Sequence, residues 1–285
     1  MSKEEDKALV LVTGAQGFLG QALVPRLLDA GANVIACDFS VDKVDTRATA
    51  LAGNIFDPDS ISPDSAGNPT HLVHLAWQDG FVLNSDAHMR NVSAHYGFLM
   101  RFISGGCTNV SVMGTMHEAG YIEGAIDENT VCVPLNEYGV AKNALRQSML
   151  LRTTSLDVCF KWLRAYYIVS NTGIGENIFA KIIRAARDGK TTFPFTTGKT
   201  KYDFISIEDL ADQITAAVLQ TEEAGIINVC SGNPVSLADR IEQFITENNL
   251  DISLDYGAFP DRPFDSPITY GDATRIQKIM GTNAT

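Results

Sequence analysis

The stretch "VLVTGAQGFLGQAL", residues 10–23, decides the fold class of this 285-residue chain. A short apolar run leads into three glycines, Gly14, Gly17 and Gly20, and then into a segment with helical spacing. Glycines between a strand and a helix permit a tight turn, close approach of the backbone to a pyrophosphate, and close helix–strand packing. The N-terminus of the helix offers N–H groups to the phosphates. The stretch therefore predicts a dinucleotide-binding unit.

An acidic residue, Asp38, ends the next predicted strand, 18 residues after Gly20 (38 minus 20). A carboxylate at this place accepts hydrogen bonds from the ribose hydroxyls of NAD and repels the 2′-phosphate of NADP. The sequence therefore predicts NAD as the cofactor. The following segment "GNIFD" (53–57) is expected over the adenine edge, with Asn54 and Ile55 as contacts.

Predicted strands and helices alternate along most of the chain. The strands cover residues 7–13, 33–38, 71–76, 108–113, 157–165 and 225–232, and the helices cover 17–31, 84–104 and 136–155. Such alternation indicates βαβ units and a parallel sheet. We predict an α/β fold, a Rossmann-type doubly wound parallel sheet with a small, irregular C-terminal substrate lobe. Residues 1–168 would form the NAD-binding domain, with 204–232 returning to it, and 169–203 and 233–285 the lobe.

The composition excludes several classes of protein. A net charge of −12, from 34 acidic and 22 basic residues, repels phosphate backbones, so we expect no nucleic-acid partner. No apolar run reaches the ~18 residues of a membrane span, and the start lacks a signal-peptide core, so we expect no membrane partner and a cytoplasmic location. Five scattered cysteines indicate neither a disulfide framework nor a metal site.

A tyrosine and a lysine lie four residues apart in "NEYGVAKNAL", residues 136–145. On a helix, Tyr138 and Lys142 share a face one turn apart. An ammonium close to a phenol stabilises the phenolate and lowers the pKa of the phenol toward the working range of a base. The spacing alone is weak evidence, because many helices contain it by chance.

Taken together, the glycine loop, Asp38, "HLAW" (74–77), Asn91 and "YGVAK" (138–142) resemble the extended short-chain dehydrogenases/reductases, and more closely their nucleotide-sugar NAD-dependent epimerase/dehydratase group. The resemblance implies that Tyr138 and Lys142 are the catalytic pair. It also implies cofactor contacts by Gly14, Gln16, Gly17, Phe18, Leu19, Gly20, Asp38, Asn54, Ile55, Leu75, Ala76, Trp77, Asn91, Tyr138 and Lys142.

The third catalytic position implied by the resemblance is a Ser or Thr in the segment "SVMGTMHEAG" (111–120). Thr115 is the counterpart, and Ser111, inside the predicted strand, is the fallback. The family's 4,6-dehydratases carry an Asp-Glu pair directly after the Thr, whereas this chain has Met116 and His117, which tells against dehydration. Two roles stay open for His117: an auxiliary acid/base, because imidazole titrates near neutrality, or a polar residue at the rim. Glu118 is a further candidate to orient substrate hydroxyls.

The other histidines do not predict a metal site. His71 and His74 lie three apart on a strand and so point to opposite faces, while His88 and His95 share a helix face with Asn91. The resemblance implies a homodimer through helices 84–104 and 136–155, and we expect His88 and His95 to pack at that interface.

The C-terminal half departs from the family pattern at substrate-binding positions. Tyr202 replaces an arginine that braces the nucleotide, and Tyr167 replaces a substrate-contacting asparagine. The closing segment "FPDRPFDSPITYGDATRIQKIMG" matches, so Arg262 is expected to grip a diphosphate, with Asp265 helping to position it. A small nucleotide-sugar substrate is thus implied, with its base and sugar undefined.

Three functions remain open at this point. The first, which we favour, is an NAD-dependent nucleotide-sugar epimerase that oxidises the sugar transiently and returns hydride to its other face. The second is an NAD(P)-dependent ketosugar reductase or sugar dehydrogenase with the same Thr-Tyr-Lys site. The third is a non-catalytic dinucleotide-binding regulator, which the presence of both Tyr138 and Lys142 disfavours.

Overall fold

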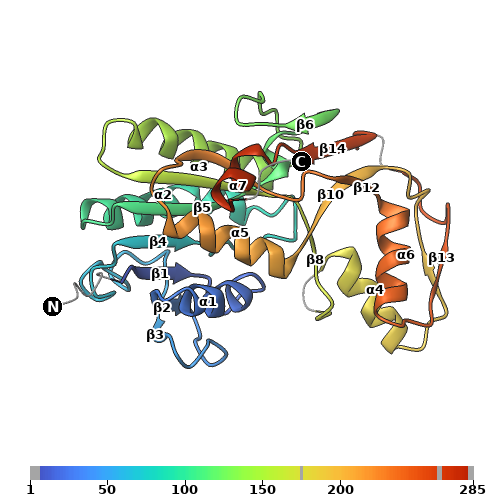
Figure 1. Cartoon of the computed structure of the whole chain (residues 1–285), viewed down its shortest axis with the longest axis horizontal. Helices are drawn as coiled ribbons and strands as arrows, with labels where there is room; N and C mark the ends of the chain where they lie inside the picture. The colour runs from blue at the N-terminus through green and yellow to red at the C-terminus, as the bar shows by residue number, and fades with distance from the viewer. Residues whose placement is uncertain (1–6, 174–175, 262–264, 282–285) are drawn as a thin grey trace.

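A seven-stranded parallel sheet forms the centre of the protein (Figure 1). The computed structural model describes residues 7–173, 176–261 and 265–281. The strand order of the sheet is β11-β7-β5-β4-β1-β2-β3, and every neighbouring pair is parallel. The strands are β1 (Leu9–Thr13), β2 (Asn33–Asp38), β3 (Thr49–Ala52), β4 (His71–His74), β5 (Asn109–Thr115), β7 (Cys159–Ala165) and β11 (Gly225–Val229). The order reverses at β1, and the crevice beside such a reversal is where doubly wound sheets bind ligands.

Helices cover both faces of this sheet. They are α1 (Gly20–Asp29), α2 (Ala87–Ser104), the short η1 (Met116–Glu118), α3 (Glu137–Thr153), α5 (Ile207–Leu219) and α7 (Thr274–Ile279). Within the described ranges, no helix combines the length and apolar character needed to cross a membrane.

Two hydrophobic clusters hold the helices to the sheet. The first packs α1, α5 and α7 against one face, with Leu23, Leu210 and Ile276 buried in it. The second packs α2 and α3 against the opposite face, with Phe98 and Met149 buried in it. Burial on both faces explains why the central strands are apolar along their length instead of alternating.

A smaller body at one end of the molecule (right in Figure 1) has its own apolar cluster, to which α4 (Ile178–Arg187), α6 (Leu237–Glu247) and β10 (Lys201–Ser206) contribute. A second sheet has the order β12-β10-β14-β6, with β8 also paired to β10, and β9 pairs with β13. These strands are β6 (Gly124–Ile126), β8 (Tyr167–Val169), β9 (Thr192–Pro194), β12 (Pro234–Ser236), β13 (Ser253–Asp255) and β14 (Ile268–Gly271).

Buried Asp203 joins parts of this second sheet. Its carboxylate accepts hydrogen bonds from the backbone N–H groups of Ser231, Gly232 and Gly271, at 2.9, 2.9 and 3.1 Å. A buried carboxylate with several N–H donors is well satisfied, so Asp203 is a structural residue.

The predicted fold class is confirmed: the sheet is parallel, flanked by helices and of the Rossmann type. Strand β3 was not predicted, because its four residues "TALA" are mostly exposed and lack an apolar pattern. The division into domains stays a prediction. Helix α7, in the segment assigned to the lobe, packs in the first cluster beside α5.

Candidate active site

The glycine loop joins β1 to α1 with its backbone closely packed. Gly14 has a φ of 72°, and a Cβ there would come within 2.7 Å of the backbone nitrogen of Ala76. A Cβ on Gly20 would lie 2.3 Å from the carbonyl oxygen of Gly14. No larger residue fits at either position without moving backbone. The loop therefore has the geometry that a pyrophosphate cradle needs.

Asp38 lies beside this loop at the end of β2. Its Oδ2 accepts a hydrogen bond of 2.9 Å from the backbone N–H of Gln16, and its Oδ1 accepts one of 2.8 Å from the N–H of Phe39. The carboxylate is thus fixed at the carboxyl edge of the sheet, next to the loop, where a ribose is expected. Loop and carboxylate together fit NAD.

The remaining predicted cofactor residues stay predictions, and the structure gives their local contacts and burial. Asn54 uses its side-chain oxygen to accept the N–H of Phe56 at 2.9 Å, and Ile55 is buried in the second cluster. Asn91 donates to the side chain of Gln78 at 2.9 Å. Partly buried members of this set are Gln16, Phe18, Leu19, Asn54, Leu75, Ala76, Trp77 and Asn91.

Thr115, Tyr138 and Lys142 lie together where β5 and α3 meet. The side chain of Thr115 lies near enough to act on the phenol of Tyr138, and the Nζ of Lys142 donates to the carbonyl oxygen of Met113 at 2.7 Å. Asn136 caps α3 by accepting the N–H of Gly139 at 2.8 Å. A Cβ on Gly139 would lie 2.3 Å from the carbonyl oxygen of His117, so this glycine lets α3 approach η1 closely.

The predicted lowering of the pKa of Tyr138 is wrong for this structure. Burial raises the pKa of the phenol, the charge of Glu118 raises it further, and only the hydrogen bond with Thr115 opposes them. Burial also lowers the pKa of Lys142 to about 7, against the opposing effect of Glu118. In this structure desolvation thus disfavours the charged form of both groups.

Glu118 cannot touch a substrate. Its side chain is fully buried, and it accepts the backbone N–H of Thr115 at 2.7 Å and the Nε1–H of Trp162 at 2.9 Å. It also pairs with Arg146 at 3.3 Å and with Arg164 at 3.6 Å. The expectation that it orients substrate hydroxyls is therefore wrong, and its place is behind Thr115.

His117 lies beside the catalytic pair. Its ring centroid is 6.0 Å from that of Tyr138, its Nδ1 lies 3.5 Å from Nδ2 of Asn136, and its backbone N–H donates to Oγ1 of Thr115 at 3.3 Å. Both roles proposed for it remain predictions. The fallback residue Ser111 is buried in β5, and its hydroxyl has no hydrogen-bond partner among the described residues.

His88 and His95 lie inside the chain, not at an outer helix face. Both are buried, and His95 stacks on Trp77 with ring centroids 4.3 Å apart and planes within 5°. His88 accepts the Nε1–H of Trp77 at 3.0 Å. The expectation that they pack at a dimer interface is wrong, because the face they share is the one that α2 turns toward the sheet.

The substrate-side residues also come together. The hydroxyl of Tyr202 donates to Oδ2 of Asp265 at 2.9 Å, and its ring lies 4.4 Å from that of Tyr167. Tyr202 is 6% exposed, so it supports Asp265 and Tyr167 more than it faces solvent. Arg262 lies outside the described residues.

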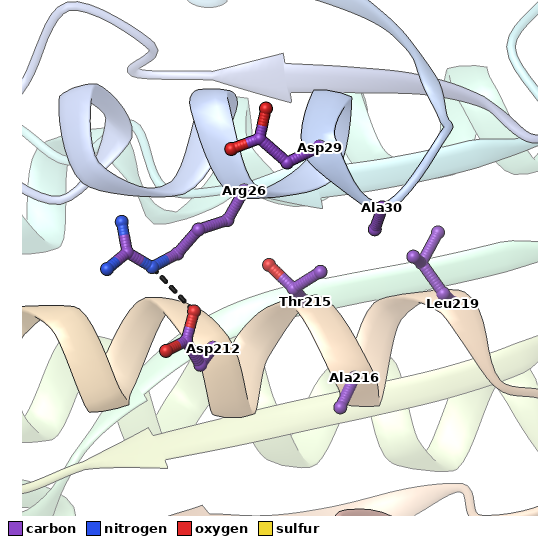
Figure 2. A pocket seen from close by; sticks show the side chains of 7 residues that line it. All are labelled: Arg26, Asp29, Ala30, Asp212, Thr215, Ala216 and Leu219. Atoms are coloured by element: carbon purple, nitrogen blue, oxygen red, sulfur yellow. Dashed lines mark hydrogen bonds and ion pairs between the residues drawn. The ribbon is translucent and has the colours of Figure 1, made fainter.

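Two hollows lie outside this site. The first, about 590 Å³, lies between α1 and α5, where Arg26 reaches across to Asp212 at 2.6 Å (Figure 2). The second, about 730 Å³, lies on α2 and α3. Neither is lined by a predicted site residue, so neither is the candidate active site.

Comparison with known proteins identifies the family. The model of the NAD dependent epimerase/dehydratase family matches residues 10–230, so the chain belongs to this family. A dTDP-6-deoxy-L-talose 4-dehydrogenase (NAD(+)) from Aggregatibacter actinomycetemcomitans is 40% identical over 267 residues, which cover 92% of this chain and 98% of the relative. A putative UDP-arabinose 4-epimerase 4 from Arabidopsis thaliana is 24% identical, over 99% of this chain and 74% of the relative.

Solved structures share the fold. UDP-glucose 4-epimerase from Thermotoga maritima, solved with UDP-glucose, has a TM-score of 0.82 at 20% identity and covers 97% of this chain and 94% of its own. MoeE5 in complex with UDP-glucose and NAD has a TM-score of 0.78 at 24% identity, with coverage of 97% and 93%.

The protein is therefore an enzyme of the extended short-chain dehydrogenase/reductase type, among NAD-dependent nucleotide-sugar epimerases and 4-dehydrogenases. The predictions of the family, of an enzyme and of NAD as cofactor are confirmed. The hypothesis of a non-catalytic regulator is dropped.

Proposed function

We propose that this protein is an NAD-dependent 4-dehydrogenase that interconverts the 4-hydroxyl and 4-keto forms of a nucleotide-linked 6-deoxyhexose. The observation that carries the proposal is the 40% identity to a dTDP-6-deoxy-L-talose 4-dehydrogenase, across 98% of that relative. The neighbouring side chains of Thr115 and Tyr138, with Lys142 one turn along α3, support it, because they suit proton transfer to and from a sugar hydroxyl.

In the oxidation direction, the phenolate of Tyr138 takes the proton of the sugar hydroxyl while the C–H bond of the same carbon breaks and the carbonyl forms. Bound NAD supplies the hydride acceptor. The hydroxyl of Thr115 holds the reacting oxygen near Tyr138, and the ammonium of Lys142 stabilises the phenolate. In the reduction direction the phenol of Tyr138 returns the proton to the forming hydroxyl.

The side chains after Thr115 support simple redox chemistry over dehydration. Met116 packs against the first cluster and has no ionisable group, so it cannot move a proton to or from the sugar. Asp38 supports NAD as the cofactor used, because its carboxylate is held beside the glycine loop.

The second candidate is the nucleotide-sugar epimerase that the sequence favoured. The UDP-arabinose 4-epimerase relative, which aligns with 99% of this chain, supports it. The two candidates share the oxidation step and differ in whether the keto sugar leaves or turns over before hydride returns.

Release of cofactor from heat-denatured protein separates the two candidates. A dehydrogenase exchanges its cofactor at every turnover, so we expect the purified protein to release little nucleotide. Near-stoichiometric NAD in the supernatant would instead favour the closed redox cycle of an epimerase.

We also propose that the protein is a homodimer through α2 and α3. Their outer surface exposes Met89 (48%) and Leu151 (80%), which flank the hollow of about 730 Å³, and large exposed apolar side chains favour association. Light scattering should give the mass of two chains, and Leu151→Glu should give the mass of one. A monomeric unmodified protein would contradict the proposal.

A further inference from the structure

Trp77 lies between the end of the sheet and the catalytic helix. It follows β4, and one face of its indole stacks on His95 at 4.3 Å. The Nζ of Lys142 lies 3.9 Å from the centroid of the same ring, and the ring of Tyr138 meets it edge-on at 6.1 Å. Trp77 thus contacts both members of the catalytic pair.

The indole is held from two sides. Trp77 donates its Nε1–H to Nδ1 of His88 at 3.0 Å, and Nε2 of His88 lies 2.7 Å from the carbonyl oxygen of Val82. Because indole is only a donor and a carbonyl only an acceptor, His88 carries its proton on Nε2. These bonds fix the plane of the ring.

On the His95 side of the indole, hydrogen bonds link a chain of buried side chains. Nδ1 of His95 lies 2.9 Å from Nε2 of His74, whose Nδ1 lies 2.9 Å from Oγ1 of Thr13. Burial lowers the pKa of His95 to about 3 and that of His74 well below its usual value, so both rings are neutral. The indole therefore rests on an uncharged support.

The ammonium of Lys142 is buried at this place. The titratable groups that interact with it are Glu118 from η1, His74 from β4, His95 from α2 and Tyr138 from its own helix. Glu118 favours the charged form, but burial outweighs it. Further support for the charge must come from uncharged partners, which the indole face and the carbonyl oxygen of Met113 supply.

We propose that Trp77 is a positioning residue for Lys142, whose indole face keeps the ammonium charged and aimed at Tyr138. The cofactor contact that the resemblance implied for Trp77 stays a prediction, and the geometry adds Lys142 as a partner of the indole. The effect on turnover rests on the proposed redox function, whereas the contact between indole and ammonium does not.

Fluorescence tests the contact without substrate. The chain has two tryptophans, so Trp162→Phe leaves Trp77 as the only one. Its emission should change in a single titration near neutral pH, and the additional Lys142→Met exchange should abolish that titration. Emission that does not titrate, or titrates equally with Lys142→Met, would overturn the proposal. If Trp162→Phe fails to fold, the emission of the unmodified protein can be compared with that of Lys142→Met alone.

Turnover tests the consequence. In ketosugar reduction with NADH, Trp77→Leu should lower kcat about 10-fold and leave the KM for NADH within about twofold. The basic limb of the plot of kcat against pH should shift to lower pH by about one unit. Trp77→Phe, which keeps an aromatic face, should move the limb less. A raised KM for NADH with an unmoved limb would make Trp77 a cofactor contact and overturn the proposal.

A control variant addresses the support of the ring. His88→Ala removes the acceptor of the indole N–H but leaves the aromatic face, so the limb should move in the same direction by a smaller amount. If the unmodified protein turns over and neither His88→Ala nor Trp77→Leu shifts the basic limb, the positioning role of Trp77 is overturned. The proposed redox function would then still stand.

Discussion

The backbone N–H of Thr115 donates a hydrogen bond of 2.7 Å to Oε1 of Glu118, so a buried carboxylate lies directly behind the candidate catalytic hydroxyl. The same carboxylate pairs with Arg146 and Arg164. It disfavours the phenolate of Tyr138 and favours the ammonium of Lys142. Burial shifts the pKa of both groups most, and this structural carboxylate adds the next largest effect.

Glu118→Gln should lower the free energy of unfolding by about 3 kcal/mol, because it leaves two arginines without their buried counter-charge. Urea denaturation measures the change. Glu128→Gln, at an exposed position, is the matched control and should change the free energy by less than about 0.5 kcal/mol. A loss no larger than that of the control would show that the carboxylate does not stabilise the fold.

Tyr138→Phe should reduce turnover by about two orders of magnitude or more, because it deletes the group that transfers the proton. Its affinity for NAD should be unchanged, as fluorescence titration can measure. Turnover close to that of the unmodified enzyme would remove Tyr138 from the mechanism.

Asp38→Ala should raise the Kd for NAD about 10-fold and narrow the preference for NAD over NADP, because it removes both the ribose acceptor and the charge that repels the 2′-phosphate. Calorimetric titration with each nucleotide gives both constants. Asp42→Ala, also after β2 but exposed, should leave them unchanged. If Asp38→Ala and Asp42→Ala bind NAD with the same Kd, Asp38 does not bind the ribose.

Lys142→Met should abolish most activity and yet raise the free energy of unfolding by about 2 kcal/mol at pH 6. The pKa of Lys142 falls from 10.5 to about 7 on folding, so between these values the unfolded chain binds more protons. Stability from this group therefore rises as pH increases from about 7 to 10.5.

The difference in free energy of unfolding between Lys142→Met and the unmodified protein should therefore decrease from pH 6 to pH 9. Denaturation curves of both proteins at each pH measure it. Lys181→Met, on the exposed side of α4, should show no such narrowing. A constant difference across this range would mean that the lysine is not desolvated in the fold.

Much of the Rossmann fold could be predicted from local sequence. Strand β2 spans residues 33–38 as predicted, and α2 and α3 differ from prediction only at their ends, because their apolar patterns are long and clear. The strands β6, β12 and β13 have three residues each and depend on partners distant in the chain, so no local pattern predicts them.

The sequence indicated which candidate residues lie near one another, but it did not indicate their electrostatics. The spacing of Tyr138 and Lys142 put them on one face, but the pKa of each depends on burial and on Glu118, which lies 20 residues before Tyr138 in the chain (138 minus 118). The contact of Lys142 with Trp77 joins segments 65 residues apart (142 minus 77), and only the fold brings them together.

The measurement that tests the proposed function most directly is NADH formation when the enzyme is mixed with dTDP-6-deoxy-L-talose and NAD. We predict that absorbance rises with repeated turnover, that the sugar product carries a 4-keto group, and that Tyr138→Phe abolishes the rise. No NADH, together with a sugar inverted at the 4-position, would contradict the dehydrogenase and establish the epimerase.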